Sequence, residues 1–124
     1  MEEHDMGDSN PTALFGAVAA ALGRRQLGFL FIREIWGADS QLPNMKKQFG
    51  GTIIANELMT RADGDRLIAE GHADAVAFGR DYIANPDLVE RFILDAPLNT
   101  PDAATFFMGG PQGYVDYPRL ILPA

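Results

Sequence analysis

A glycine and an arginine directly follow a short apolar run near the middle of the chain, and this pair could bind a phosphate. The apolar run is residues 73–78, and Gly79-Arg80 comes next. A glycine lets an anionic ligand approach the backbone, and an arginine offers a fixed positive charge with a fork of donors suited to phosphate. A tight turn with a surface arginine has the same spacing, and on spacing alone it is the commoner case.

The elements on either side of this pair must position it. Residues 73–78, bounded by glycines, predict a strand that is buried on both faces, as in a parallel sheet covered by helices. Asn85 is then expected to cap a helix, with Pro86 at its first position and Asp87 in its first turn. The strand would pass into the helix through a short turn that carries the glycine and the arginine.

A second charged pair ends another apolar run. Arg33-Glu34 follows residues 28–32, which predict a buried strand. Charged residues at the carboxyl end of such a strand lie at the rim where α/β proteins bind ligands, but an ion pair within the chain explains them equally well. The histidines, His4 and His72, fit no catalytic triad or metal cluster, and His72 is expected at the surface.

Composition narrows the class of protein. The 124 residues include no cysteine, so the sequence predicts neither disulfides nor a thiolate metal site. The formal net charge of −7 argues against nucleic-acid binding through a broad basic face. No apolar run approaches membrane-spanning length, and the acidic N-terminus is unlike a signal peptide, so we expect a cytoplasmic protein that does not bind membranes.

The remaining pattern is that of β/α units. Asn10-Pro11 predicts a helix start, residues 43–49 a short helix and residues 52–55 a strand; Thr60 and Asp63 resemble a capping box. The sequence thus predicts an acidic arm at 1–9, β/α units over 10–97 and an ordered C-terminal meander over 98–124. Three parallel strands cannot close into a barrel, so they would leave unpaired edges and an uncovered apolar face.

Several of these segments resemble the Old Yellow Enzyme family, the FMN-dependent ene-reductases on a TIM (β/α)8 barrel. The resemblance is carried by Ala-Val-Ala-Phe-Gly-Arg-Asp-Tyr-Ile-Ala-Asn-Pro-Asp-Leu at 75–88, by Pro-Leu-Asn at 97–99 and by Gly-Tyr-Val-Asp-Tyr-Pro at 113–118. Segments 8–11, 28–34 and 54–56 resemble the family in the same order. The resemblance implies the C-terminal part of the barrel, about strands six to eight, in an α/β fold that needs a complementary N-terminal part to close.

The resemblance also implies a cofactor site. Barrel phosphate sites lie at the loops after strands seven and eight, where Asn56, Glu57, Leu58, Gly79 and Arg80 fall. The family implies that these residues hold the FMN phosphate. It further implies that the aromatic ring at position 106 lies near the flavin, and that the residue at position 107 lines the substrate pocket; these are Phe106 and Phe107.

Two departures from the family matter. Relatives commonly have glycine at position 57 and often at 58, where this chain has Glu57 and Leu58. A carboxylate aimed at a phosphate would repel it, so we expect Glu57 to point away, toward Arg33, Arg61 or a lysine. The family's substrate-binding pair, His/Asn or His/His, and its proton-donating tyrosine come from the first half of the barrel, so no catalytic residue is expected here.

Three functions are therefore open. The chain could be the C-terminal portion of an ene-reductase that reduces activated C=C bonds with NAD(P)H, with a complementary N-terminal chain as its partner after a gene split, a permutation or an engineered cut. It could be a stand-alone phosphate- or flavin-binding module that closes its own sheet as a homo-oligomer. It could also be an inactive fragment with an interaction role. Bound flavin would separate the first two from the third.

Overall fold

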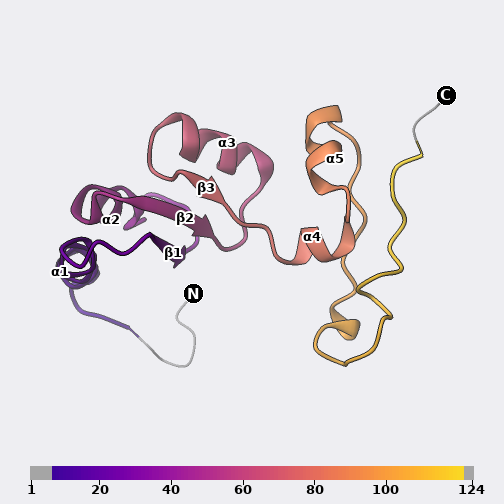
Figure 1. The fold of residues 1–124 in the computed structure, drawn as a ribbon, viewed down its shortest axis with the longest axis horizontal. Coiled ribbons are helices and arrows are strands. Elements are labelled where there is room, and N and C mark those ends of the chain that lie inside the picture. Colours follow the sequence, from indigo (N-terminus) through magenta and orange to yellow (C-terminus); the bar gives the residue numbers. More distant parts are fainter. Residues whose placement is uncertain (1–6, 122–124) are drawn as a thin grey trace. The chain divides into compact units, whose positions relative to one another are not determined.

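The computed structural model describes residues 7–121, and the chain divides into two units on either side of the Ala77–Phe78 bond (Figure 1). The first unit holds the sheet, and the second holds two short helices and the C-terminal segment. His4 and most of the expected acidic arm lie outside the described residues. The boundary expected after Pro97 stays a prediction.

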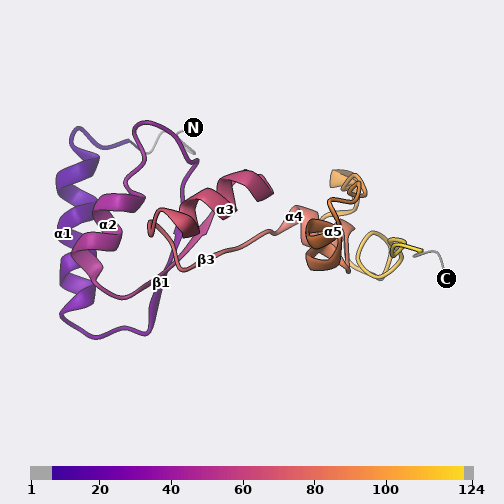
Figure 2. The ribbon, with the colours of Figure 1, turned by 90° about the horizontal axis from the view of Figure 1, so that it is seen from above.

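The first unit is built on a parallel sheet of three described strands in the order β1-β2-β3, which are labelled in Figure 1. Figure 2 shows the same unit from above, with α1 and α2 side by side. The strands are β1 (Phe29–Arg33), β2 (Thr52–Asn56) and β3 (Ala75–Val76). The parallel β/α pattern expected from the sequence is confirmed. The third strand is shorter than the apolar run 73–78, although Asp74 N–H and Ala77 N–H continue its ladder to carbonyl groups of β2 at 2.9 Å.

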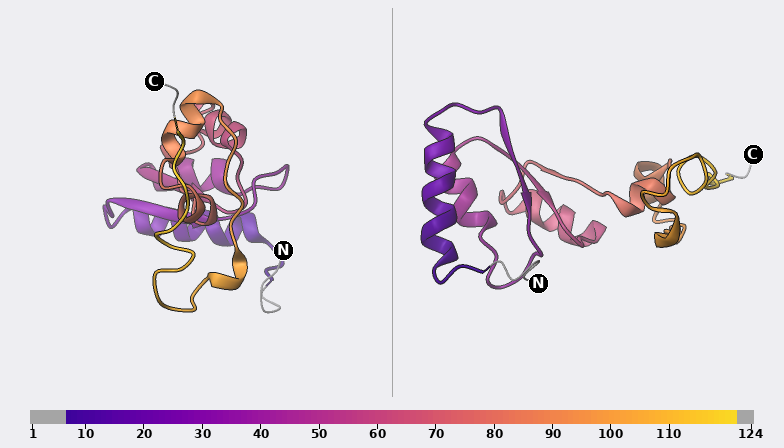
Figure 3. Two further views of the ribbon diagram at one scale, coloured as in Figure 1. Left: turned by 90° about the vertical axis from the view of Figure 1, so that its right-hand side faces the viewer. Right: turned by 90° about the horizontal axis from the view of Figure 1, so that it is seen from below.

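Three helices accompany these strands, and in each of them at least one terminus lies where the local sequence predicts it. They are α1 (Pro11–Gly23), α2 (Leu42–Phe49) and α3 (Arg61–Ala69). The Asn10 side chain accepts the N–H of Ala13, Gly50 ends α2 in the left-handed conformation, and Thr60 and Asp63 form both bonds of a capping box. Helix α1 packs against α2, α2 against β2, and α3 against β3 (Figure 3, right).

One face of β1 is exposed in the described chain. The prediction that residues 28–32 form a buried strand is therefore wrong. Ile53, Ala55 and Leu67 are fully buried, but Phe29 is 56% exposed and Phe31 54%. Ile32, on the other side of β1, is only 9% exposed, and no described element of the first unit covers Phe29 and Phe31. An uncovered apolar face was expected of three parallel strands, and β1 presents it.

The second unit corrects two expectations about the segment after β3. Its helices are α4 (Arg80–Ala84) and α5 (Leu88–Leu94), followed by the 3-10 turn η2 (Ala103–Thr105). Gly79-Arg80 is therefore a helix start and not a free turn. Asn85 ends α4 instead of capping the next helix, which begins after Asp87. The reason is tertiary, because the Asn85 side chain bonds the backbone of Asn99 in both directions, at 2.7 and 3.3 Å.

A buried ion pair ties the C-terminal segment to α5. Arg91 Nε lies 2.8 Å from Asp87 Oδ1, and both side chains are at most 5% exposed. Arg91 also donates to the carbonyls of Pro97 and Pro118 at 2.6 and 3.0 Å, while the other Asp87 oxygen accepts the N–H of Leu120 at 2.7 Å. One pair of side chains thus fixes three points of the C-terminal segment.

Candidate functional site

The first candidate segment, Asn56–Leu58, leaves the carboxyl end of β2. The Asn56 side chain donates to the carbonyl of Ala77 at 2.7 Å, so its amide holds the end of the sheet together. Glu57 and Leu58 both have positive φ, +107° and +50°. Those values favour glycine, which is the residue that the family resemblance gives at these positions.

The backbone of this segment offers donors. Among residues 7–121, no acceptor is bonded to the N–H of Glu57 or of Leu58. Consecutive free N–H groups in such a turn can bind an anion. The donor set therefore fits a phosphate, even though the side chains are not glycine.

The Glu57 carboxylate is turned aside, as expected. It forms an ion pair with Arg33 Nε at the end of β1, one of the three partners proposed from the sequence. The pair joins the ends of adjacent parallel strands, whose last residues Arg33 and Asn56 are in register. Because a cation sits on it, this carboxylate repels an anion at the segment less than a lone carboxylate would.

Glu34 accepts hydrogen bonds from the start of α2, a structural role that the sequence did not predict. Its carboxylate accepts the N–H groups of Gln41 and Leu42 at 2.7 and 3.2 Å and the hydroxyl of Ser40 at 2.8 Å. It therefore caps the start of α2 from the end of β1, across a loop. Arg33 and Glu34 are adjacent, but they reach different elements: Arg33 pairs with Glu57 after β2, and Glu34 bonds the start of α2. No local spacing signals this cap, because Glu34 is seven residues before Gln41.

The second candidate segment, Gly79-Arg80, belongs to the other unit. Gly79 has φ −84°, and a Cβ built on it meets no atom within 4 Å, so nothing in the chain's own packing demands glycine there. Arg80 begins α4 and is exposed. Within residues 7–121, no hydrogen bond or ion pair involves its guanidinium group, which leaves its donors open to a ligand.

The two aromatic candidates lie in contact with each other. The rings of Phe106 and Phe107 meet edge to face, with centroids 6.5 Å apart. Phe107 is 95% exposed and has φ +61°, and its N–H donates to the Tyr114 hydroxyl at 2.9 Å. Phe106 is half-buried. Its ring and the exposed ring of Phe107 are both available to line a cavity.

His72 takes no part in either candidate segment. Its ring packs on Trp36 with centroids 5.6 Å apart, and its Nε2 lies 3.4 Å from a Glu70 oxygen. In the part of the chain that the structure describes, no three His, Cys, Asp or Glu side chains are placed to hold a metal ion.

Comparison with known proteins gives this geometry its context. No family model matches the chain. It is 41% identical over 128 residues to 12-oxophytodienoate reductase 1 of Oryza sativa subsp. japonica, a match that covers 94% of this chain and 33% of the relative. For 12-oxophytodienoate reductase 2 of Arabidopsis thaliana the identity is 39%, with the same coverage. Morphinone reductase in complex with tetrahydroNAD superposes with a TM-score of 0.86 at 38% identity, covering 98% of this chain and 34% of that one. The chain belongs to the Old Yellow Enzyme family.

The match is to the C-terminal part of Old Yellow Enzyme proteins. A variant of NCR from Zymomonas mobilis also superposes, with a TM-score of 0.83 at 31% identity, over 94% of this chain and 40% of that chain. The chain spans about a third of the length of the curated relatives it matches. The structural neighbours are TIM barrels, so the three-stranded parallel sheet corresponds to part of a barrel. In the described residues, no helix is long and apolar enough to cross a membrane.

Proposed function

We propose that this chain is the C-terminal portion of an FMN-dependent ene-reductase, which reduces small activated alkenes with NAD(P)H once a complementary N-terminal part completes the barrel. The observation that carries the proposal is the match over 98% of the chain to morphinone reductase, at a TM-score of 0.86. The strands β1 to β3 would be about the sixth to eighth of the barrel. The Old Yellow Enzyme homologues are flavin-dependent oxidoreductases.

The groups proposed for the FMN phosphate are those that the family resemblance implies. In the first unit, Asn56 fixes the end of β2 and the N–H groups of Glu57 and Leu58 point to no acceptor among the described residues. In the second unit, Gly79 has no side chain that could hinder an anion at its backbone. Arg80 supplies a guanidinium group that has no polar partner among the described residues. Each of these segments follows a strand of the sheet, β2 or β3, at its carboxyl end, where barrels bind phosphate.

Bound FMN would supply hydride transfer from the nicotinamide to the activated C=C bond. This chain's residues would bind and enclose the reactants. Phe106 would pack near the flavin ring and Phe107 would line the substrate pocket, where it presents a ring without the hydroxyl of a tyrosine. The residues that orient the substrate carbonyl and donate the proton would come from the complementary part, so we assign no catalytic residue to this chain.

The test is flavin binding by the chain co-expressed with its complementary part. Arg80→Ala should weaken FMN binding by about 1.5–3 kcal/mol, the range for a hydrogen bond to a charged group. Arg24→Ala, which removes an exposed arginine at the end of α1, is the matched control and should leave the affinity unchanged. Fluorescence titration of the apoprotein with FMN gives both values.

Equal FMN affinities for the two variants would remove Arg80 from the phosphate site. A co-expressed protein without flavin absorbance would contradict the proposed function as a whole. That result would favour an interaction role for the chain.

A further inference from the structure

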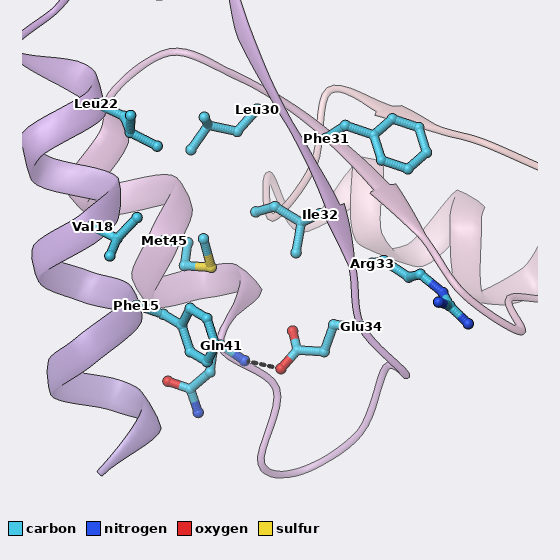
Figure 4. Close-up of a pocket in the computed structure, with 10 residues that line it drawn as sticks. All are labelled: Phe15, Val18, Leu22, Leu30, Phe31, Ile32, Arg33, Glu34, Gln41 and Met45. Atoms are coloured by element: carbon cyan, nitrogen blue, oxygen red, sulfur yellow. Dashed lines mark hydrogen bonds between the residues drawn. The ribbon is translucent and has the colours of Figure 1, made fainter. Parts of the chain in front are cut away.

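An ion pair joins the ends of β1 and β2 at the first candidate segment. Arg33, the last residue of β1, pairs through its Nε with the carboxylate of Glu57. Figure 4 shows the Arg33 side chain on the side of β1 that faces away from α1, whereas Glu34 turns toward Gln41. The guanidinium group is therefore available to the segment after β2 and not to the helical layer.

The sheet fixes where the two partners meet. Arg33 is in register with Asn56, the residue before Glu57, and the N–H of Glu34 donates to the Asn56 carbonyl at 2.9 Å. The ladder thus continues to the last residues of both strands, so the backbone of Arg33 has a fixed position beside Glu57. The Glu57 side chain is 22% exposed and the Arg33 side chain 56%. A carboxylate that is mostly removed from water needs a charged partner, and Arg33 supplies it.

The backbone beside the pair has a conformation that residues with a side chain rarely adopt. The φ angle is +107° at Glu57 and +50° at Leu58. Glycine reaches such angles without steric cost, but glutamate and leucine do not, so other contacts must hold them there. The ion pair is such a contact, because it fixes the end of the Glu57 side chain against the end of β1.

We propose that Arg33 is a positioning residue for the FMN phosphate and that it acts through Glu57. Its pairing keeps residues 57 and 58 in the positive-φ conformation, with their N–H groups open to an anion, and it neutralises the carboxylate beside those donors. The inference rests on the proposed function. The ion pair thereby compensates for the loss of the glycine that the family resemblance gives at position 57.

A double-mutant cycle tests whether Arg33 acts through Glu57. The four proteins are the wild type, Arg33→Met, Glu57→Gly and the double variant, each co-expressed with the N-terminal two thirds of the rice 12-oxophytodienoate reductase 1. Methionine removes the charge of Arg33 but keeps an unbranched side chain, and glycine removes the carboxylate but keeps the N–H at position 57. Each apoprotein is titrated with FMN and with riboflavin, which has the same ring system and no phosphate. Flavin fluorescence gives both dissociation constants.

Arg33→Met should raise the FMN dissociation constant at least about tenfold, because the freed carboxylate repels the phosphate. It should change the riboflavin constant by less than about twofold, since riboflavin carries no phosphate to be repelled. In the Glu57→Gly background, Arg33→Met should also change FMN binding by less than about twofold, because no carboxylate is left to restrain. Arg33→Lys keeps the positive charge and should weaken FMN binding less than Arg33→Met does.

The possible failures can be told apart. A wild-type complex that binds neither flavin would overturn the proposed function and this inference together. If the wild type binds FMN and Arg33→Met binds it equally well, the positioning role alone is overturned. Equal losses of FMN affinity in both backgrounds would overturn it as well and would indicate that Arg33 contacts the phosphate itself. Equal losses of FMN and riboflavin affinity would also overturn it, because they would indicate a general structural role.

Discussion

Replacing Arg91 by methionine should destabilise the second unit strongly. The change leaves the Asp87 carboxylate, whose side chain is 1% exposed, without its cation, and it removes the donors at 2.6 and 3.0 Å from the carbonyls of Pro97 and Pro118. Removing one partner of a buried ion pair costs about 3–5 kcal/mol, because the other charge stays buried and uncompensated. A domain's whole stability is about 5–15 kcal/mol, so the loss should unfold the C-terminal segment under mild conditions.

Arg61→Met is the matched control for this prediction. Arg61 pairs with Asp65 at the same four-residue spacing, at 3.4 Å, but the side chains are 41% and 71% exposed. Exposed pairs contribute about 0.2–1 kcal/mol, so this variant should behave almost like the wild type. The comparison sets a buried pair with two further backbone hydrogen bonds against an exposed pair at the same spacing.

The chain provides separate spectroscopic reporters for the two units. Its three tyrosines, Tyr82, Tyr114 and Tyr117, are all in the second unit, and its one tryptophan, Trp36, is in the first. Urea unfolding of Arg91→Met should shift the tyrosine near-ultraviolet circular dichroism and leave the Trp36 emission transition in place. A loss below about 1 kcal/mol in the tyrosine transition would refute the assignment of a buried pair that anchors the segment.

Two further predictions concern the first unit. Leu58→Gly should stabilise it by about 0.5–1 kcal/mol in urea unfolding, because φ +50° strains leucine, whereas Leu58→Ala keeps the Cβ and should not stabilise it. Hydrogen bonds from the hydroxyl and then the N–H of Thr60 hold the pKa of Asp63 below its ordinary value of 3.8. A depressed carboxyl pKa adds stability that is present above about pH 4 and lost as the pH falls through the folded pKa. Thr60→Ala should therefore destabilise the unit by roughly 1 kcal/mol at pH 7 and by less below pH 4, measured by the same urea unfolding. A destabilisation that does not change with pH would contradict the capping box.

Local sequence signals determined the helix ends and the order of elements in the first unit. Asn10 before a proline, Thr60 with Asp63, and Gly50 after α2 each act within a few residues, so the sequence contains the whole interaction. The short apolar runs likewise predicted parallel strands, because only a sheet with a helical layer buries such runs. The same local pattern carried the resemblance to the Old Yellow Enzyme family.

Contacts between residues that are distant in the sequence decided the roles of the remaining polar side chains. Asn85 has the residue type and the following proline of a helix cap, but its side chain bonds the backbone of Asn99. The Asp87 carboxylate likewise accepts the N–H of Leu120, 33 residues away. Glu34 likewise caps α2 across a loop. The cause is general: a polar side chain that leaves water bonds whichever donor or acceptor the packing brings to it, and chain distance does not enter that choice.

The exposure of β1 also depends on tertiary structure. Residues 28–32 are a continuous apolar run, from which the sequence predicted a strand buried on both faces. Whether a face is buried depends on what packs against it, and within the described residues nothing covers Phe29 and Phe31. The sequence alone thus determined that this chain is part of a barrel. The tertiary structure decided which face of β1 is exposed, because burial is a property of neighbouring elements and not of the strand itself.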